Sequence, residues 1–458
     1  MADKLSSDLQ VLIISFAFAP DGEIGAKRVT RFCGYLPEFG IQPIVLTVQE
    51  RFLIRRDDSF FPPPGVRVER TTVWQNPLQW YAGLKKRILP PPASGNASPI
   101  AISAERPRNG RRGFFRRHLL GLLQTPDQFV GWYLPAVKAA ERLIEHEPIV
   151  VILSSGPPWT NHLVACHLRK KYGIPWVADF RDGWGTSHLL EARWEREVNA
   201  RMEASCLRRA DLVVCNTEAL RRSFVERYPL LQPKKFATLT NGFDNLSAPP
   251  VLPTALKRNT RLFLHLGTIY GRRRIDTFCQ AVDDLVNVGK LHPGSFKVLF
   301  QGETDESSVA TVQQRAPELV RNGCIEFKPF IDNWQQAQEL ICCADLLLVF
   351  SGSPLEVPAK FYDYLKTGKP IFAVAEPGAL TELLDHTGSG IWADPADPAG
   401  IATALLRALQ LPGVTPEEAE RRWSSQFHFR SLTAQLASWI RRVAAQHSTA
   451  GGSTGTKI

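Results

Sequence analysis

The chain has 458 residues, of which 44 % are hydrophobic and 22 % are charged. These are ordinary proportions for globular proteins, so they exclude a fibrous protein and a chain that is disordered throughout. The length predicts two or three domains. Lys and Arg outnumber Asp and Glu by 55 − 45 = 10, which indicates an anionic partner such as phosphate, nucleic acid or a membrane surface.

The eight Cys form no C-x-x-C pair. We therefore expect reduced, mostly buried thiols rather than a zinc ribbon or a disulfide scaffold. The longest apolar run, 11–19, is too short to span a bilayer. Asp3 and Asp8 before it deprive it of the positive charge that a signal peptide needs. These features predict a soluble, cytoplasmic chain.

Short apolar runs alternate with helical stretches along the chain. Strands are expected at 11–16, 43–48, 149–154, 175–180, 211–216 and 236–240, with helices at 135–145, 162–172 and 189–209. A second series of strands is expected at 261–267, 296–302, 325–329, 345–350, 370–375 and 390–393, with helices at 276–288 and 359–367. Strands that are apolar throughout and separated by helices predict two doubly wound, Rossmann-like α/β domains.

The breaks in this pattern predict the domain organisation. A first domain covers 1–242 and carries a mobile insertion at 83–120, and a second covers 259–412. The Pro-rich stretch 245–258 is expected to be the linker. Two helices, 416–422 and 431–444, are expected within a closing element at 413–447, before a disordered tail at 448–458.

One segment carries most of the excess positive charge. Residues 85–117 hold nine Lys or Arg, one Glu and five Pro. Such a segment is either a solvated loop or a tether to anionic lipid headgroups, at about 1 kcal/mol per basic residue near the surface. Nucleic acid ranks lowest, because the chain has no RNA-binding motif or zinc finger.

Ligands of open α/β sheets bind beyond the carboxyl ends of the strands, so the loops there are the candidate sites. In the first half, Gly22 and Gly25 shape a loop that either cradles an anion or is simply a tight turn. The loop 179–188 contains Asp179 and Asp182, which could orient a hydroxyl or act as a general base. Alternatively, they cap a helix and pair with Arg181.

In the second half, a strand is followed by Gly267, Thr268 and the triplet Arg272–Arg274. Three guanidinium groups at a strand end suit a diphosphate, although a solvated basic turn is the alternative. Lys360 and Asp363 lie three residues apart on a helix that is expected to open near Pro358. They either serve a phosphate and a ribose or form a surface salt bridge.

Several segments resemble retaining glycosyltransferases of the GT-B fold, the glycogen-synthase-like family that includes family 4-like enzymes of bacterial polysaccharide assembly. They are VLIISFAFAPDGEIGAKRVTRFCGYLPEFG, ADLVVCNTEALRRSF followed by TLTNGFD, HLGTIYGRRR, and VPAKFYDYLKTGKPIFA with the Gly378 loop after it. The resemblance covers nearly the whole chain outside 50–125. It implies two domains facing across a cleft, with C-terminal helices that close back.

The resemblance also implies a mechanism. A nucleotide-diphosphate sugar would bind the second domain through Gly267, Thr268, Arg272, Arg274 and Asp363, and the catalytic groups would be Asp182, Arg273 and Lys360. Gly22, Gly25 and Asp179 would form the acceptor or phosphate loop. The enzyme would retain the anomeric configuration without a metal or cofactor. Its acceptor would be a saccharide, lipid-linked at the inner membrane surface that 85–117 contacts, and nucleic acid would not be a partner.

The chain departs from the family at one place. The family often has two Glu separated by seven residues, whereas this chain has Leu355 and Asp363 at those positions. This departure leaves open a non-catalytic GT-B scaffold in a polysaccharide assembly complex. A nucleotide-sugar epimerase of the same fold, which would not need the basic insertion, is the other alternative.

Overall fold

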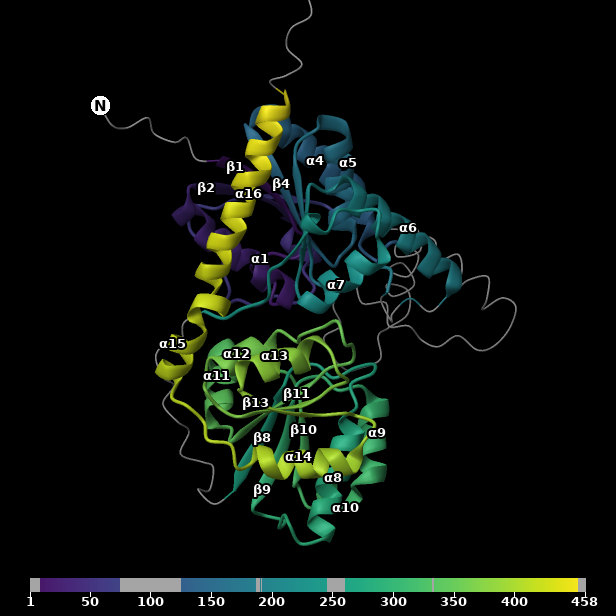
Figure 1. Cartoon of the computed structure of the whole chain (residues 1–458), viewed down its shortest axis with the longest axis vertical. Helices are drawn as coiled ribbons and strands as arrows, with labels where there is room; N and C mark the ends of the chain where they lie inside the picture. Colours follow the sequence, from purple (N-terminus) through teal and green to yellow (C-terminus); the bar gives the residue numbers. More distant parts are fainter. Residues whose placement is uncertain are drawn as a thin grey trace, which may run out of the picture. The chain divides into compact units, whose positions relative to one another are not determined.

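The computed structural model describes residues 9–74, 125–186, 190, 192–244, 260–331 and 333–451. The chain forms two units (Figure 1). Unit 1 comprises residues 1–216, 223–239 and 433–458, and unit 2 comprises residues 217–222 and 240–432. The chain thus passes into unit 2 at 239–240, close to the expected boundary at 242, and the expected group of helices at 413–447 is divided between the units.

Several predictions concern residues outside the described part. These are the insertion 83–120 with its basic segment 85–117, the end of the loop 179–188, the linker 245–258, and residues 452–458 of the expected tail.

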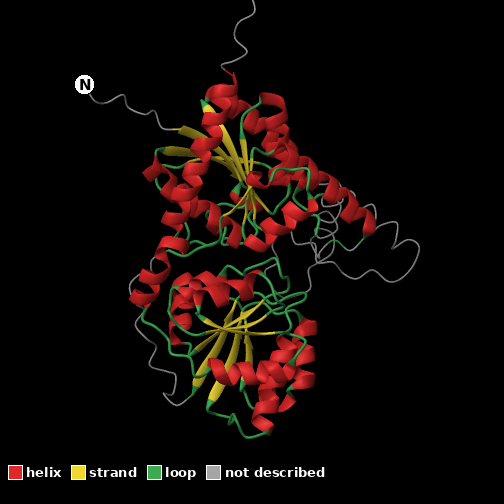
Figure 2. Cartoon of the chain, in the orientation of Figure 1, coloured by secondary structure: helices red, strands yellow, loops and turns green. Residues whose placement is uncertain are grey.

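Unit 1 is built around a seven-stranded parallel sheet with the order β3-β2-β1-β4-β5-β6-β7. Helices lie on both sides of it (Figure 2). Its central strands are buried on both faces, as Val11, Leu12, Ile13 and Ile14 are fully inaccessible. The strands are β1 Leu9–Ile14, β2 Ile41–Val48, β3 Arg67–Thr71, β4 Ile149–Gly156, β5 Trp176–Phe180, β6 Leu212–Cys215 and β7 Phe236–Thr238.

The helices that follow these strands are α1 Ile24–Tyr35, α4 Tyr133–His146, α5 Thr160–Tyr172, α6 Arg193–Arg209 and α7 Glu218–Arg227, the last of which begins in unit 2. Short 3₁₀ helices occur at η1 Leu36–Phe39, η2 Glu50–Phe52, η3 Val130–Trp132 and η4 Pro233–Lys235.

Sequence reasoning missed β3. Its residues, RVERT, include one aliphatic side chain, and the strand forms the edge of the sheet next to β2. Because an edge strand covers little core, it carries no apolar run that a sequence pattern can detect.

Unit 2 has a six-stranded parallel sheet with the order β10-β9-β8-β11-β12-β13. Alternate residues of one strand enter different cores, since Phe263 belongs to one buried cluster and Leu262 and Leu264 to another. This explains why its central strands carry apolar residues on both faces. The strands are β8 Arg261–Leu266, β9 Phe296–Gln301, β10 Ile325–Lys328, β11 Leu346–Phe350, β12 Ile371–Val374 and β13 Gly390–Ala393.

The helices of unit 2 are α8 Ile275–Asn287, α9 Glu306–Arg315, α10 Pro317–Arg321, α11 Trp334–Cys343, α12 Lys360–Leu365, α13 Ala379–Thr387, α14 Pro398–Ala408 and α15 Pro416–Phe427. All twelve predicted strands are present, and most of them begin or end one or two residues away from the predicted position. The predicted tail needs a correction: α16, Phe429–Gly451, continues through its first four residues, because no helix-breaking residue occurs before Gly451.

All eight Cys are free, as expected, and five of them are buried. None of the described helices combines the length and the apolar character that crossing a membrane requires.

Candidate functional site

In unit 2, a buried histidine holds a lysine at the end of β8. The Nζ of Lys360, the first residue of α12, lies 2.8 Å from His265 Nε2. His265 Nδ1 lies 3.0 Å from the Leu348 carbonyl oxygen, which can only accept, so Nδ1 carries the proton and Nε2 accepts from the ammonium. Burial and the charge of Lys360 lower the pKa of His265 well below its ordinary value, so the ring is neutral.

Glycine is required where Lys360 passes β8. Gly267 has a φ of +113°, and a Cβ there would lie 3.0 Å from Lys360 Nζ. Its amide donates to the Gln301 carbonyl oxygen at 2.8 Å, which fixes the chain as it leaves the strand. The ammonium can therefore lie directly against the backbone at the carboxyl end of β8.

Arg273 belongs to the same group of residues. Its Nη1 donates to the Thr268 carbonyl oxygen at 2.7 Å, and its guanidinium lies 4.4 Å from the centre of the Tyr270 ring. Burial, followed by the charge of Arg273, lowers the pKa of Lys360 well below its ordinary value. The structure thus brings together four of the predicted residues, Gly267, Thr268, Arg273 and Lys360.

The other two arginines of the triplet lie apart from this group. Arg274 donates to both carboxylate oxygens of Asp276 at 2.8 and 2.9 Å, and Arg315 also approaches that carboxylate, at 3.3 Å. Arg272 is exposed, and its Cβ faces Gly352. In the described part of the chain, no contact joins Arg272 or Arg274 to Lys360.

Asp363 does not form the salt bridge with Lys360 that the three-residue spacing allows. Its Oδ1 lies 3.8 Å from Lys366 Nζ, and the carboxylate side chain is 19 % exposed. That Oδ1 is buried and accepts no hydrogen bond from the described residues. A buried acceptor without a donor is costly, so a ligand hydroxyl at this place would be stabilising.

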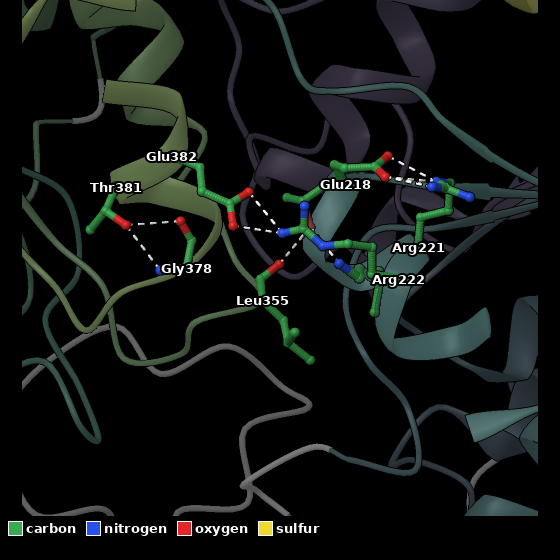
Figure 3. A network of polar contacts seen from close by, with 9 residues as sticks. Glu218, Arg221, Arg222, Leu355, Gly378, Thr381 and Glu382 are labelled. Carbon is green, nitrogen blue, oxygen red and sulfur yellow. Dashed lines mark hydrogen bonds and ion pairs between the residues drawn. The ribbon is translucent and has the colours of Figure 1, made fainter. Parts of the chain in front are cut away.

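Hydrogen bonds to backbone carbonyl oxygens hold the segment before α12 in place (Figure 3). Thr217 Oγ1 donates to the Leu355 carbonyl oxygen at 2.7 Å, and the Ala379 amide donates to that of Pro354 at 2.8 Å. Close by, Arg222 binds both carboxylate oxygens of Glu382 at 2.6 and 2.8 Å. The position where the family often has its first Glu is thus filled by a leucine whose carbonyl is bound within unit 2.

In unit 1, Asp179 belongs to a buried ion pair. Arg28 donates to it through Nε at 3.1 Å and Nη2 at 2.9 Å, and Ser155 Oγ donates at 2.7 Å. Burial acts to raise the pKa of Asp179, but Arg28, Ser155 and Arg181 together lower it. Both carboxylate oxygens of Asp179 therefore accept hydrogen bonds from other residues of unit 1.

Arg181, two residues after Asp179, lies against the start of α1. A Cβ on Gly25 would come within 1.8 Å of Arg181 Nη1. The Arg181 amide donates to the Gly156 carbonyl oxygen at 2.9 Å, and its Nε is buried without a hydrogen bond. Burial lowers the pKa of Arg181, while the charges of Asp182, Asp179 and Glu23 act to raise it.

Gly22 lies in a loop that Asp21 organises. The buried Asp21 carboxylate accepts from the amides of Glu23, Ile54 and Arg55 at 3.1, 3.2 and 3.4 Å. Burial raises its pKa to about 6, against the effect of these hydrogen bonds. The Gly22 amide donates to the Arg55 carbonyl oxygen at 2.7 Å, so this glycine shapes the approach to α1.

Sequence reasoning missed three residues of these groups. His265 is a polar residue among the buried Leu and Phe residues of β8, and this was a signal available in the sequence. The sequence around Arg28 gave no such signal, because its partner Asp179 is 151 residues away. Arg181 was noted only as a pairing partner for the aspartates. No three described His, Cys, Asp or Glu side chains form a group that could hold a metal ion.

Two family models match the chain in the order of the two units. A glycosyl transferase 4-like domain matches residues 25–242, and a glycosyl transferases group 1 domain matches residues 260–411. Together they include every predicted site residue except Gly22. The comparison with curated protein sequences gives no match.

Solved structures share the fold at low sequence identity. Sucrose-phosphate synthase from Thermosynechococcus elongatus is 16 % identical, with a TM-score of 0.64 over 96 % of this chain and 100 % of that one. HepE from Anabaena, solved with UDP and glucose, is 14 % identical, with a TM-score of 0.60 over 95 % and 100 %. A trehalose-phosphate synthase from Burkholderia xenovorans, solved with glucose-6-phosphate, is 12 % identical, with a TM-score of 0.59 over 95 % and 99 %.

Proposed function

Because the chain belongs to the glycosyltransferases of the GT-B fold, we propose that it transfers a sugar from a nucleotide-diphosphate donor to a saccharide acceptor. The transfer retains the anomeric configuration and serves the assembly of a cell-surface polysaccharide. The donor binds unit 2, and the acceptor binds unit 1.

The observation that carries this proposal is the placement of Lys360 and Arg273 at the end of β8. Lys360 is held by a neutral imidazole, and Arg273 by a carbonyl oxygen and an aromatic ring, so neither charge is cancelled by these contacts. As the bond from the sugar to the diphosphate breaks, negative charge develops on the departing oxygen. Cations already in place stabilise that charge, by about 2.7–4 kcal/mol for a key group.

The remaining predicted residues have roles that fit the same reaction. Asp363 offers its buried Oδ1, which accepts no hydrogen bond from the described residues, to a ribose hydroxyl. In a retaining transfer, the acceptor hydroxyl attacks from the face that the diphosphate leaves. Asp182 then orients that hydroxyl and forms no covalent bond to the sugar. Arg272 and Arg274 add positive charge at a distance from the reacting atoms.

The basic segment 85–117 supports a lipid-linked acceptor. Its nine Lys or Arg against one Glu suit an anionic membrane surface, at about 1 kcal/mol each. We therefore place the enzyme on the cytoplasmic side of a membrane, at its surface.

Thermal denaturation with UDP, GDP, ADP, CMP and dTDP, each with and without its sugars, tests the proposal. A nucleotide at about 100 times its dissociation constant stabilises the protein by roughly 2.7 kcal/mol. We expect one diphosphate to raise the melting temperature of the wild type, and Lys360→Met and Arg273→Ala to remove that rise. The matched control is Arg274→Ala, which should keep it.

If no nucleotide raises the melting temperature, the donor site is inactive and the scaffold becomes the better hypothesis. If a nucleotide sugar is converted without any acceptor, the epimerase is correct instead.

A further inference from the structure

Two cysteines on different helices of unit 1 face each other. Cys166 belongs to α5 and Cys206 to α6, and their thiols are hydrogen-bond partners. The Sγ of Cys206 also lies 3.9 Å from the carbonyl oxygen of His162, to which it donates. His162 precedes Cys166 by about one turn of α5, and a helical side chain leans over the turn before it. Both contacts therefore place the sulfur of Cys206 beside that of Cys166.

The two thiols differ in exposure and in charge. Cys166 is half-buried, whereas Cys206 is fully buried. The hydrogen bond with Cys206 lowers the pKa of Cys166 to about 7, with help from Arg209, Ser205 and Lys170 and against the effect of burial. The same hydrogen bond, together with burial, raises the pKa of Cys206 well above its ordinary value. Cys166 thus supplies a thiolate near the surface, and Cys206 supplies a protonated thiol behind it.

The titratable groups that act on this pair come from three helices. Arg209 and Glu203 lie on α6, Lys170 on α5 and Tyr133 on α4. The positive charges of Arg209 and Lys170 favour the thiolate form of Cys166. The negative charge of Glu203 acts instead on the buried thiol and keeps it protonated. A reactive cysteine in proteins has such surroundings: a half-exposed sulfur next to basic side chains.

We propose that Cys166 and Cys206 form a peroxide-reactive pair, in which Cys166 attacks the oxidant and Cys206 completes a disulfide between α5 and α6. With hydrogen peroxide, the Cys166 thiolate takes one oxygen atom as the O–O bond breaks. A sulfenic acid forms, and the departing hydroxide takes up a proton to give water. The Cys206 sulfur then attacks the Cys166 sulfur, the S–O bond breaks, and a second water leaves. The two thiols lose two electrons, and the peroxide gains them.

The disulfide would involve a helix that also anchors a loop of the candidate site. Three residues before Cys206, Glu203 accepts hydrogen bonds from the amides of Trp184 and Gly185 at 3.1 and 2.9 Å. These amides directly follow Asp182 and its neighbour in the chain. The oxidation itself is independent of the proposed function, because it needs neither a nucleotide nor an acceptor.

Cys342 and Cys343 are a matched control for the reactive pair. Both are half-buried, as Cys166 is, and they are adjacent residues at the end of α11. Burial raises the pKa of each of these thiols. Adjacent residues of a helix do not face each other. We therefore expect Cys342 and Cys343 to react slowly and to form no disulfide with each other.

The experiment treats the reduced, folded, full-length protein with equimolar hydrogen peroxide at pH 7 and maps the products by mass spectrometry of alkylated peptides. We expect the disulfide 166–206 as the main product, formed about tenfold or more faster than any oxidation at Cys342 or Cys343. Dithiothreitol should reverse it. Cys206→Ser should leave a sulfenic acid at Cys166 that dimedone traps, whereas Cys342→Ser should react as the wild type does.

Two further readouts test the charges and the geometry. The reaction rate should rise with pH through a midpoint near 7, because the thiolate of Cys166 is present above its lowered pKa, and Arg209→Gln should move that midpoint upward. The oxidised protein should melt several degrees higher than the reduced one, because the cross-link restricts the unfolded chain.

The inference is wrong if peroxide oxidises Cys166 without linking it to Cys206, or if Cys342 or Cys343 reacts first. A lower melting temperature after oxidation would also contradict it, since the two sulfurs would then meet only after the helices had been distorted. The disulfide map of the wild type decides these outcomes without any variant. Melting temperatures of the reduced proteins show which variants are folded.

Discussion

In unit 1, the buried carboxylate at the end of β5 is bound by a buried guanidinium, whereas in unit 2 the ammonium at the end of β8 is bound by a neutral imidazole. Asp179 and Arg28 neutralise each other. Lys360 and His265 form an equally close contact that leaves the positive charge in place. Position at a strand end therefore does not by itself distinguish a ligand-binding group from a structural one. The partner that holds the group makes the distinction.

The largest effect should come from breaking the pair in unit 1. Arg28→Met leaves the Asp179 carboxylate buried without the guanidinium that donates hydrogen bonds to it, which costs about 3–5 kcal/mol of stability. In the wild type the pKa of Asp179 is lowered, so its contribution is present above the ordinary value of 3.8 and is lost as the pH falls through the lowered pKa. In the variant the pKa should be raised, so that acidification stabilises the protein. Melting temperatures of the wild type and the variant, measured over a range of pH, give both the loss of stability and its pH dependence.

The double variant Arg28→Met/Asp179→Asn is the control for this change. It removes both charges and should recover part of the lost stability. If the melting temperatures of Arg28→Met and the wild type changed with pH in the same way, Arg28 would not be the group that lowers the pKa of Asp179.

The second effect concerns the residue that holds Lys360. His265→Leu removes the acceptor of a hydrogen bond from a charged donor, a bond that contributes about 1.5–3 kcal/mol. We expect affinity for the nucleotide to fall roughly tenfold to a hundredfold, as measured by calorimetry. His265→Gln places an amide oxygen near the same position and should recover part of the affinity. Equal losses in both variants would indicate a packing role instead.

A third, smaller effect is a pH dependence of donor binding. Burial and Arg273 lower the pKa of Lys360, and a bound diphosphate should raise it again. Binding then takes up a proton, and affinity falls as the pH rises from the lowered value toward 10.5, by at most about tenfold per pH unit. Calorimetry with UDP and GDP in two buffers of different ionisation enthalpy measures this uptake. Lys360→Arg stays charged and should show only the uptake by the nucleotide itself.

The fold was predictable because its determinants are local. In parallel sheets covered on both faces, each central strand is largely apolar on both faces, and a segment such as 261–266 is recognisable on its own. The edge strand β3 was not predictable, because Val68 is its one aliphatic residue. Gly267, Arg273 and Lys360, which the structure brings together, could be proposed from the sequence because each follows or precedes a recognisable element.

The pairing of charges was not predictable. Asp179 follows the pattern of a functional strand-end residue, and its partner Arg28 is 151 residues distant, in a helix with no motif that refers to it. His265, 95 residues from Lys360, resembles a core histidine until the two are seen together. Spacing in sequence indicates which residues reach the edge of a sheet. Which charges remain available for a ligand depends on contacts between distant segments.

The smallest expected effect is that of Arg274→Ala, and it tests the comparison within a single turn. Arg274 is 47 % exposed and bound to Asp276, and Arg315 also contacts that carboxylate, so its loss should cost about 0.2–1 kcal/mol of stability. Nucleotide-induced stabilisation should stay as in the wild type, while Arg273→Ala, one residue away, should abolish it. Thermal denaturation of the two variants side by side measures both quantities. If Arg274→Ala abolished the nucleotide effect as well, a guanidinium paired with a carboxylate would still serve the donor, and partner identity would no longer separate structural from ligand-binding charges.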